Sequence, residues 1–268
     1  MSLEPVVPGA KVLLTDSSAK PAPGAPSREE ARARVAKLTA RLDELQEALY
    51  AEGKRAVLVV LQGRDTAGKD GVIRNVFGPL NPQGLSVTSF KAPTPLELAH
   101  DYLWRAHQAV PPRGSIGIFN RSHYEDVLVV RVHQLVPESV WRPRYEQIGL
   151  FERILAGNGV TILKFFLHIS RAEQRERLLS RLGDRKKYWK FSPGDLAERA
   201  RWDDYTAAYE EALAQTSTPD APWYVVPADD KHLRDLWVAE VVTAAMERLD
   251  PTYPGPPDGL ETFRHELG

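Results

Sequence analysis

The chain has 268 residues, enough for one large α/β domain or two small ones with a substantial core. Its formal net charge is -1 and it has no cysteine, which excludes nucleic-acid binding by overall charge, disulfides, thiolate metal sites and a cysteine nucleophile. No segment has the roughly 18 apolar residues of a membrane helix and the N-terminus lacks a signal pattern, so we expect a cytoplasmic protein that binds neither membrane nor nucleic acid.

The N-terminal segment, residues 1–26, carries several prolines and is expected to be extended. Ser27 and Glu30 then form a capping box, and leucines and valines recur every three or four residues up to Leu49, which predicts an amphipathic helix. We expect one domain over residues 27–250, followed by a Pro- and Gly-rich tail over residues 251–268.

A phosphate-binding loop is predicted after the apolar strand at residues 56–61. Gly63, Gly68 and Lys69 match the spacing G-x-x-x-x-G-K, in which backbone N–H groups and the lysine surround phosphoryl oxygens. The spacing alone occurs by chance, but a buried strand before it and helical spacing after it supply the required context. Two carboxylates are unusual here: Asp70 replaces the usual Ser or Thr, and Asp65 would repel a polyanion unless a cation screened it.

The remaining elements alternate between strands and helices. Strands are expected at 84–90, 115–119, 160–169 and 223–227, and helices at 95–108, 137–156, 171–182, 193–215 and 230–249. This alternation predicts a five-stranded parallel sheet covered on both faces, with ligands at the carboxyl ends of the strands. Residues 91–94 are either a helix start or part of a cradle for a second substrate, and the tryptophans within helices are expected in the core.

A run of polar side chains, Asn120 to Asp126, follows the third strand and should open on the same edge as the phosphate loop. A carboxylate directly after this strand would normally hold magnesium, but Asn120 stands there. Asp65, Glu125 and Asp126 are therefore the candidates for positioning a metal. A solvated loop is the alternative for Arg121 and His123.

Residues 171–190 carry eight basic and three acidic side chains, a local net charge of +5 in a chain of net charge -1. Such a segment is often only a solvated face. Because this one follows a strand and ends in Tyr188, Trp189 and Lys190, we interpret it as a lid that closes over phosphates, with its mobile part at about 183–194.

Together, the Asp-bearing loop from Gly63 to Gly71, the turn from Phe119 to Asp126 and the basic lid resemble the polyphosphate kinase 2 family over roughly residues 28–249. Asn120 with Glu125 and Asp126 is similar to its class III branch. The resemblance implies a three-layer α/β/α P-loop kinase fold of the thymidylate-kinase type. It also implies Mg²⁺-dependent transfer of the terminal phosphoryl group from inorganic polyphosphate to AMP and ADP, giving ADP and ATP, by a dimeric or tetrameric enzyme.

Residue by residue, the resemblance implies three groups of site residues. Catalytic roles fall to Asp65, Lys69, Arg121, Glu125 and Asp126, with Asp65 and Asp126 near Mg²⁺, directly or through water. Nucleotide and phosphate contacts fall to Gly63, Arg64, Ala67, Gly68, Asp70, Arg74, Asn120 and His123. The polyphosphate path would be lined by Arg177, Arg181, Lys187 and Lys190.

Two other functions fit parts of the sequence. An ATP-dependent nucleoside monophosphate kinase would share the fold, the loop and the lid, although Asp70 is unusual for it. A nucleotide-binding module without turnover would explain the altered magnesium motif.

Overall fold

The computed structural model describes residues 3–267. Its centre is a parallel sheet of five strands in the order β2-β3-β1-β4-β5. The strands are β1 (Ala56–Gln62), β2 (Leu85–Ser89), β3 (Ile116–Asn120), β4 (Val160–His168) and β5 (Trp223–Pro227). The predicted strands are thus confirmed, each within one residue at either end.

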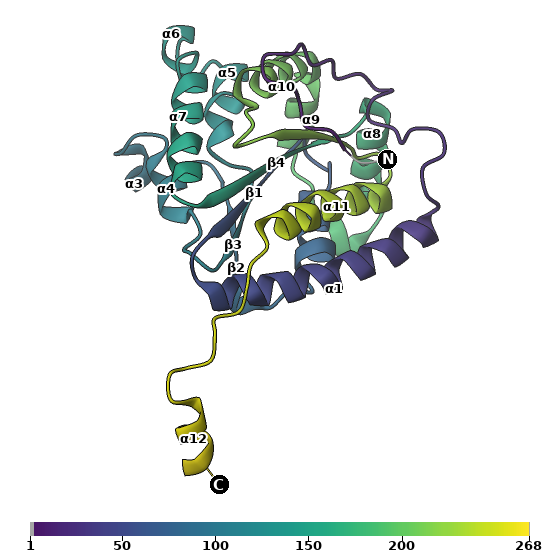
Figure 1. Cartoon of the computed structure of the whole chain (residues 1–268). Coiled ribbons are helices and arrows are strands. Elements are labelled where there is room, and N and C mark those ends of the chain that lie inside the picture. Colours follow the sequence, from purple (N-terminus) through teal and green to yellow (C-terminus); the bar gives the residue numbers. More distant parts are fainter. Residues whose placement is uncertain (1–2, 268) are drawn as a thin grey trace.

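Helices cover both faces of the sheet, as Figure 1 shows. Successive side chains of a strand point to opposite faces, so β1 contributes Val57, Val59 and Leu61 to one core cluster and Leu58 and Val60 to the other. On the first face lie α1 (Arg28–Glu52), α2 (Lys69–Val72) with its π-helical continuation (Ile73–Phe77), and α11 (Lys231–Leu249). On the second lie α5 (Val129–Val132), α7 (Arg144–Gly157) and α10 (Trp202–Thr216). The result is the expected three-layer α/β/α arrangement.

Local sequence signals place several helix ends correctly. The side chain of Ser27 caps α1 and the capping box with Glu30 is present, while Gly53 ends the helix in the left-handed conformation. Asp230 caps α11 by accepting from the backbone N–H groups of His232 and Leu233. Thr94 caps α3 (Pro95–Leu98), so the segment of residues 91–94 leads into a helix, and its contact with a second substrate stays a prediction.

Three predicted long helices are interrupted. Residues 95–108 form α3 and α4 (Trp104–Ala109), with a turn between them in which Asp101 accepts from the N–H of Leu103. Residues 137–156 form α6 (Glu138–Trp141) and α7, because Pro143 has no N–H to donate to a continuing helix. Residues 193–215 form α9 (Gly194–Ala200) and α10, separated at Arg201, whose backbone N–H donates to Glu198 O three residues back, as at a helix end. The helical spacing of apolar residues in the sequence did not predict these breaks.

Residues 3–26 contain no helix and lie along the domain. Val6 N donates to Trp223 O at 2.8 Å, Leu14 N to Glu210 Oε1 at 2.8 Å, and His168 Nε2 lies 2.8 Å from Thr15 O. These contacts hold the segment against β5, β4 and α10. At the other end, residues 251–267 project away from the body in Figure 1 and carry a short helix, α12 (Leu260–Glu266), where only a tail was expected. Across residues 3–267, no helix has the length and apolarity to cross a membrane.

A buried charged network lies beneath the turn that follows β3. Lys164 Nζ on β4 donates to Glu152 Oε2 at 2.6 Å, Tyr124 Oη at 2.8 Å and Thr216 O at 2.7 Å. The side chains of Lys164 and Glu152 are 0% and 2% exposed. The three N–H donors of the ammonium group are therefore all used in a buried site, and loss of the Glu152 carboxylate would leave the charge of Lys164 uncompensated.

Replacing Glu152 with alanine is expected to destabilise the protein by about 3–5 kcal/mol, because Lys164 would stay buried without its carboxylate. Urea unfolding measures this change. The matched control is Glu138→Ala, which removes a largely exposed carboxylate paired with Arg142 at 2.6 Å and should leave the unfolding midpoint unchanged. Equal shifts of the two midpoints would contradict the prediction.

Candidate functional site

The phosphate loop runs from Gly63 at the end of β1 to Lys69 at the start of α2. Gly63 and Gly68 have φ values of 152° and 109°, in the region that favours glycine. A Cβ on Gly63 would lie 2.7 Å from Leu167 O, and one on Gly68 would lie 1.8 Å from Arg234 Nη1. Both glycines of the sequence motif are thus required by the backbone and by close neighbours.

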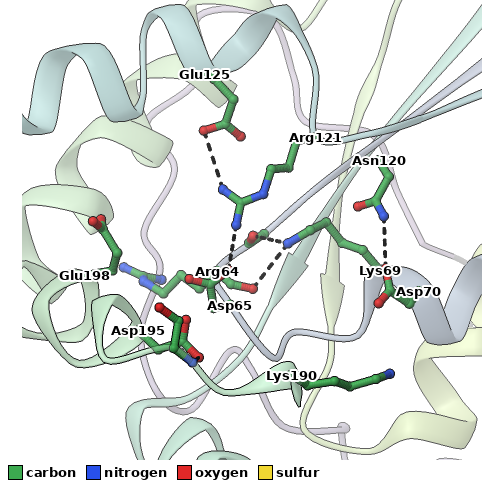
Figure 2. Close-up of polar contacts among 12 residues, drawn as sticks. Arg64, Asp65, Lys69, Asp70, Asn120, Arg121, Glu125, Lys190, Asp195 and Glu198 are labelled. Carbon is green, nitrogen blue, oxygen red and sulfur yellow. Dashed lines mark hydrogen bonds and ion pairs between the residues drawn. The ribbon is translucent and has the colours of Figure 1, made fainter. Parts of the chain in front are cut away.

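Lys69 bends back over this loop (Figure 2). Its Nζ donates to Gly63 O at 2.6 Å and to Arg64 O at 3.4 Å, and the residue is 9% exposed. Burial, helped by the nearby guanidinium of Arg121, lowers the pKa of Lys69 to about 8, although Asp65 acts in the opposite direction. The ammonium group is therefore charged at neutral pH and loses its charge within a mildly alkaline range.

The dependence of activity on pH should reflect the titration of the Lys69 ammonium group. Lys69 carries its charge below its pKa of about 8, so kcat/KM for a phosphate-chain substrate is expected to fall as pH rises above that value. Measuring kcat/KM between about pH 6.5 and about pH 9.5 checks the prediction. A profile that stays flat through the alkaline range would contradict it.

Arg121 lies opposite Lys69, and its guanidinium group lies between the carboxylates of Asp65 and Glu125. Its backbone has a φ of 62° and its N–H donates to Leu61 O at 3.0 Å, which turns the side chain back over the loop. Arg121 Nη2 donates to Asp65 Oδ1 at 2.6 Å, and Nη1 lies 3.8 Å from Glu125 Oε2. Burial alone would lower the pKa of Arg121, but Glu125 and Asp65 outweigh it and raise that pKa. The unusual Asp65 thus has a cationic neighbour, as the sequence required.

Asp70 and Asn120 meet at the other side of the loop. Asn120 Nδ2 donates to Asp70 Oδ1 at 2.9 Å (Figure 2). Within residues 3–267, no three His, Asp or Glu side chains are grouped to hold a metal. Asp65 and Asp70 nevertheless line one pocket, which suits Mg²⁺, an ion that takes one or two carboxylates and completes its shell with substrate phosphates and water.

A strongly basic pocket of about 400 Å³ opens over the loop and the lid; we call it the phosphate pocket. It is lined by two carboxylates, Asp65 and Asp70, and by seven basic residues, Lys69, Arg121, Arg177, Arg181, Lys187, Lys190 and Lys231. A polyanion is therefore attracted here although the whole chain has a net charge of -1.

The lid consists of α8 (Arg171–Leu182), a 3₁₀ segment (Arg185–Lys190) and α9. The two lid arginines that line the phosphate pocket, Arg177 and Arg181, are engaged within the protein. Arg177 donates to the backbone oxygens of Thr66, Ala67, Ala228 and Asp229 and to Glu173, so it ties α8 to the phosphate loop. Arg181 donates to Lys190 O at 2.8 Å and to Asp195 Oδ2 at 3.2 Å, which braces the lid itself. Lys187 and Lys190 line the pocket at the lid side.

A second cavity of about 200 Å³, the aromatic pocket, adjoins the first. Trp202, Tyr205 and Tyr209 of α10 line it together with Arg64, whose guanidinium lies 3.9 Å from the Trp202 ring centroid. Burial lowers the pKa of Arg64 to about 10. Asp65 and Arg121 line both pockets and therefore stand where the two meet.

The sequence assigned Trp202 only to the core and did not single out Tyr205 or Tyr209. Their spacing of three and four residues was an available signal for a shared helix face. It does not distinguish a core face from a pocket wall. Lys231 of the phosphate pocket carried no comparable signal.

The structure does not bring four of the predicted residues to these pockets. Ala67 is fully buried within the phosphate loop and lines neither pocket. His123 is fully buried against Glu152 and Phe151, and burial lowers its pKa. Arg74 is exposed on the π-helical turn and lines neither pocket.

Asp126 lines a separate cavity of about 460 Å³, where Arg144 Nη1 donates to it at 2.9 Å and Arg105 Nη2 lies at 3.9 Å. Burial raises the pKa of Asp126 to about 6 against the effect of both arginines. Asp65 and Asp126, the two carboxylates expected near Mg²⁺, therefore lie in different pockets. Neighbouring side chains of the 3₁₀ turn His123–Asp126 diverge, so adjacency in sequence did not bring Glu125 and Asp126 together.

Three comparisons place these features among known proteins. The family model for polyphosphate kinase 2 matches residues 25–253. An AMP/ADP-polyphosphate phosphotransferase of Meiothermus ruber is 56% identical over 227 residues, covering 85% of each chain. An ADP-polyphosphate phosphotransferase of Rhodopseudomonas palustris is 51% identical over 226 residues, covering 80% of this chain and 78% of the other.

The fold has a solved counterpart. The crystal structure of polyphosphate kinase 2 from Arthrobacter aurescens TC1 superposes with a TM-score of 0.90 at 41% sequence identity, covering 99% of this chain and 98% of that one. The family match spans the strands, the loop and the lid that build both pockets. This chain therefore belongs to the polyphosphate kinase 2 family.

Proposed function

We propose that this protein transfers the terminal phosphoryl group of inorganic polyphosphate to AMP and to ADP, and that the transfer depends on Mg²⁺. The observation that carries the proposal is the Asp65–Arg121 ion pair at 2.6 Å, which lines a basic pocket on one side and an aromatic pocket on the other. The names of the relatives from Meiothermus ruber and Rhodopseudomonas palustris support the same substrates.

The linings of the two pockets indicate which substrate each takes. Among the described residues of the phosphate pocket, none is aromatic, and its basic side chains suit a chain of phosphates that has no base. The aromatic pocket offers the half-buried ring of Tyr205, which can stack on a base, beside Trp202, whose ring is covered by Arg64. It also offers Arg121 for the nucleotide phosphate. Polyphosphate therefore occupies the first pocket and the nucleotide the second, with their phosphates meeting at Asp65 and Arg121.

The reaction needs positioning more than acid–base chemistry. A terminal phosphate oxygen of AMP or ADP attacks the end phosphorus of polyphosphate, and the bond from that phosphorus to its bridging oxygen breaks. The nucleotide gains one phosphoryl group and the polymer leaves one unit shorter, with the electron pair on its new terminal oxygen. Lys69 and Arg121 hold the transferred group and its neighbour, and their charges stabilise the negative charge that shifts during transfer. The nucleophile is already an anion, so no general base is required.

Asp65 and Asp70 would hold Mg²⁺, directly or through water. The ion would supply charge neutralisation between two polyanions. Arg121 keeps Asp65 in place at this position, and Asn120 does the same for Asp70.

Purified protein mixed with polyphosphate, AMP and Mg²⁺ should form ADP and then ATP. Orthophosphate in place of polyphosphate is the control for donor identity and should give no product. Absence of both ADP and ATP in the complete mixture would refute the proposed function.

A nucleoside monophosphate kinase remains the nearest alternative because it would share the loop and the lid. It would phosphorylate AMP faster with ATP than with polyphosphate, so a direct comparison of the two donors separates the functions. The resemblance to the family also leads us to propose a homo-oligomer, a dimer or tetramer, which light scattering on the eluting protein would measure.

A further inference from the structure

Gln62 is a buried polar residue at the junction between the phosphate loop and the turn that bears Arg121 and Glu125. It is the last residue of β1, it is 1% exposed, and it directly precedes Gly63. It lines neither the phosphate pocket nor the aromatic pocket, so it is placed to act through a neighbour and not on a substrate.

The side-chain amide of Gln62 can be placed in two orientations, and in one of them both its nitrogen and its oxygen form hydrogen bonds. The nitrogen donates to Glu125 Oε1 at 3.2 Å, and the oxygen accepts from Ser122 N at 3.1 Å and from Ser122 Oγ at 3.0 Å. In the opposite orientation the oxygen would face the Glu125 carboxylate, which can only accept. Ser122 Oγ in turn accepts from Tyr124 N at 3.1 Å, so its hydroxyl proton is available to Gln62.

These bonds constrain the catalytic turn at several points. The main-chain bond from Arg121 N to Leu61 O lies directly beside them, so β1 and the turn are joined by main chain and side chain together. One oxygen of Glu125 is taken by Gln62, and the other, Oε2, faces Arg121 Nη1 at 3.8 Å. A neutral amide suits this place because it can donate to a carboxylate without adding a second charge.

We propose that Gln62 is a positioning residue that fixes the carboxylate of Glu125, and through it the guanidinium of Arg121, at the edge of the aromatic pocket. The inference rests on the proposed function, in which that pocket holds the nucleotide acceptor. Because Glu125 lines the aromatic pocket and not the phosphate pocket, Gln62 governs the use of AMP and ADP more than the use of polyphosphate.

A double-mutant cycle tests this role. Gln62→Glu puts two carboxylates within about 3 Å, and Glu125→Gln removes the charge that Gln62 holds, so each should lower kcat/KM for AMP by about 10- to 100-fold. The double variant restores one amide and one carboxylate with their positions exchanged. The kcat/KM of the double variant for AMP should be about tenfold higher than the value obtained by multiplying the two single losses. The KM for AMP should rise in each single variant while the KM for polyphosphate changes little.

Gln46→Glu is the matched control. Gln46 is another fully buried glutamine, on α1, whose amide bonds the backbone of Asn81 far from the pockets. This variant should lower the unfolding temperature without a selective rise in the KM for AMP.

The results separate the inference from the proposed function. Additive single effects in an active enzyme, or a KM for AMP that does not change in Gln62→Glu, would overturn the role of Gln62 and leave the function standing. An inactive wild type would overturn the function. The same cycle read in unfolding temperatures would then decide whether Gln62 and Glu125 are coupled, and additivity there would refute the contact itself.

Discussion

Replacing Lys69 with methionine is expected to lower kcat for transfer from polyphosphate by about 10²- to 10³-fold, with little change in the fold. Methionine keeps the length and apolar stem of the side chain but removes the ammonium that sits over Gly63 O and Arg64 O. The ammonium group lies at the phosphate loop, where it can stabilise the negative charge on the transferred group during transfer. Its loss should therefore raise the free energy of the transition state more than it weakens substrate binding. Steady-state kinetics with AMP as acceptor measure the change.

The matched control for this variant is Lys37→Met on the exposed side of α1, which should retain full activity. Circular dichroism and the unfolding temperature of both variants should match those of the wild type. Retention of most of the transfer rate by Lys69→Met would contradict the assignment of this lysine. A nucleotide-binding module without turnover would show no transfer in the wild type to begin with.

Replacing Asp65 with asparagine is expected to lower kcat by about 10²-fold and to raise the Mg²⁺ concentration needed for half-maximal rate. The amide has the same shape but no charge. It therefore loses both the ion pair with Arg121 at 2.6 Å and the attraction for a divalent cation in the phosphate pocket. Titrating Mg²⁺ at saturating polyphosphate and AMP, for wild type and variant, gives both quantities.

Asp204→Asn serves as the control, since this exposed aspartate of α10 lines neither pocket. Its Mg²⁺ titration should overlay that of the wild type. The same Mg²⁺ requirement in Asp65→Asn and wild type would show that Asp65 acts only through Arg121. Asp70, which Asn120 holds at 2.9 Å, would then be the carboxylate nearest the metal.

Local patterns in the sequence predicted much of the scaffold. Apolar runs fixed the strands because a central parallel strand is buried on both faces, and the helix caps at Ser27 and Asp230 depend on side chains only a few residues away. The phosphate loop was equally local, since its glycines and lysine are set by one strand, one turn and one helix.

Residues in contact across long sequence distances could not be predicted in the same way. The sequence grouped Glu125 with Asp126 because they are adjacent, yet one lies against Arg121 and the other against Arg144 in a different cavity. The resemblance placed Arg177 along the polyphosphate path, and Arg177 does line the phosphate pocket. Its N–H groups also donate to the backbone oxygens of two distant segments, residues 66–67 and 228–229, which no local pattern predicted. Which way a side chain turns depends on elements that pack against it, and local periodicity carries no information about them.

By itself, therefore, the sequence determined the α/β architecture, the phosphate loop with its two unusual carboxylates, and the basic lid, because each rests on short-range spacing and composition. Only the tertiary structure decided that Asp65 pairs with Arg121 where two pockets meet, that His123 is buried, and that α10 supplies an aromatic wall. These facts arise where the carboxyl ends of β1 and β3 meet α8 and α10, segments up to 140 residues apart. The contact between Gln62 and Glu125 was likewise decided only by the tertiary structure, since 63 residues separate the end of β1 from this position in the turn after β3.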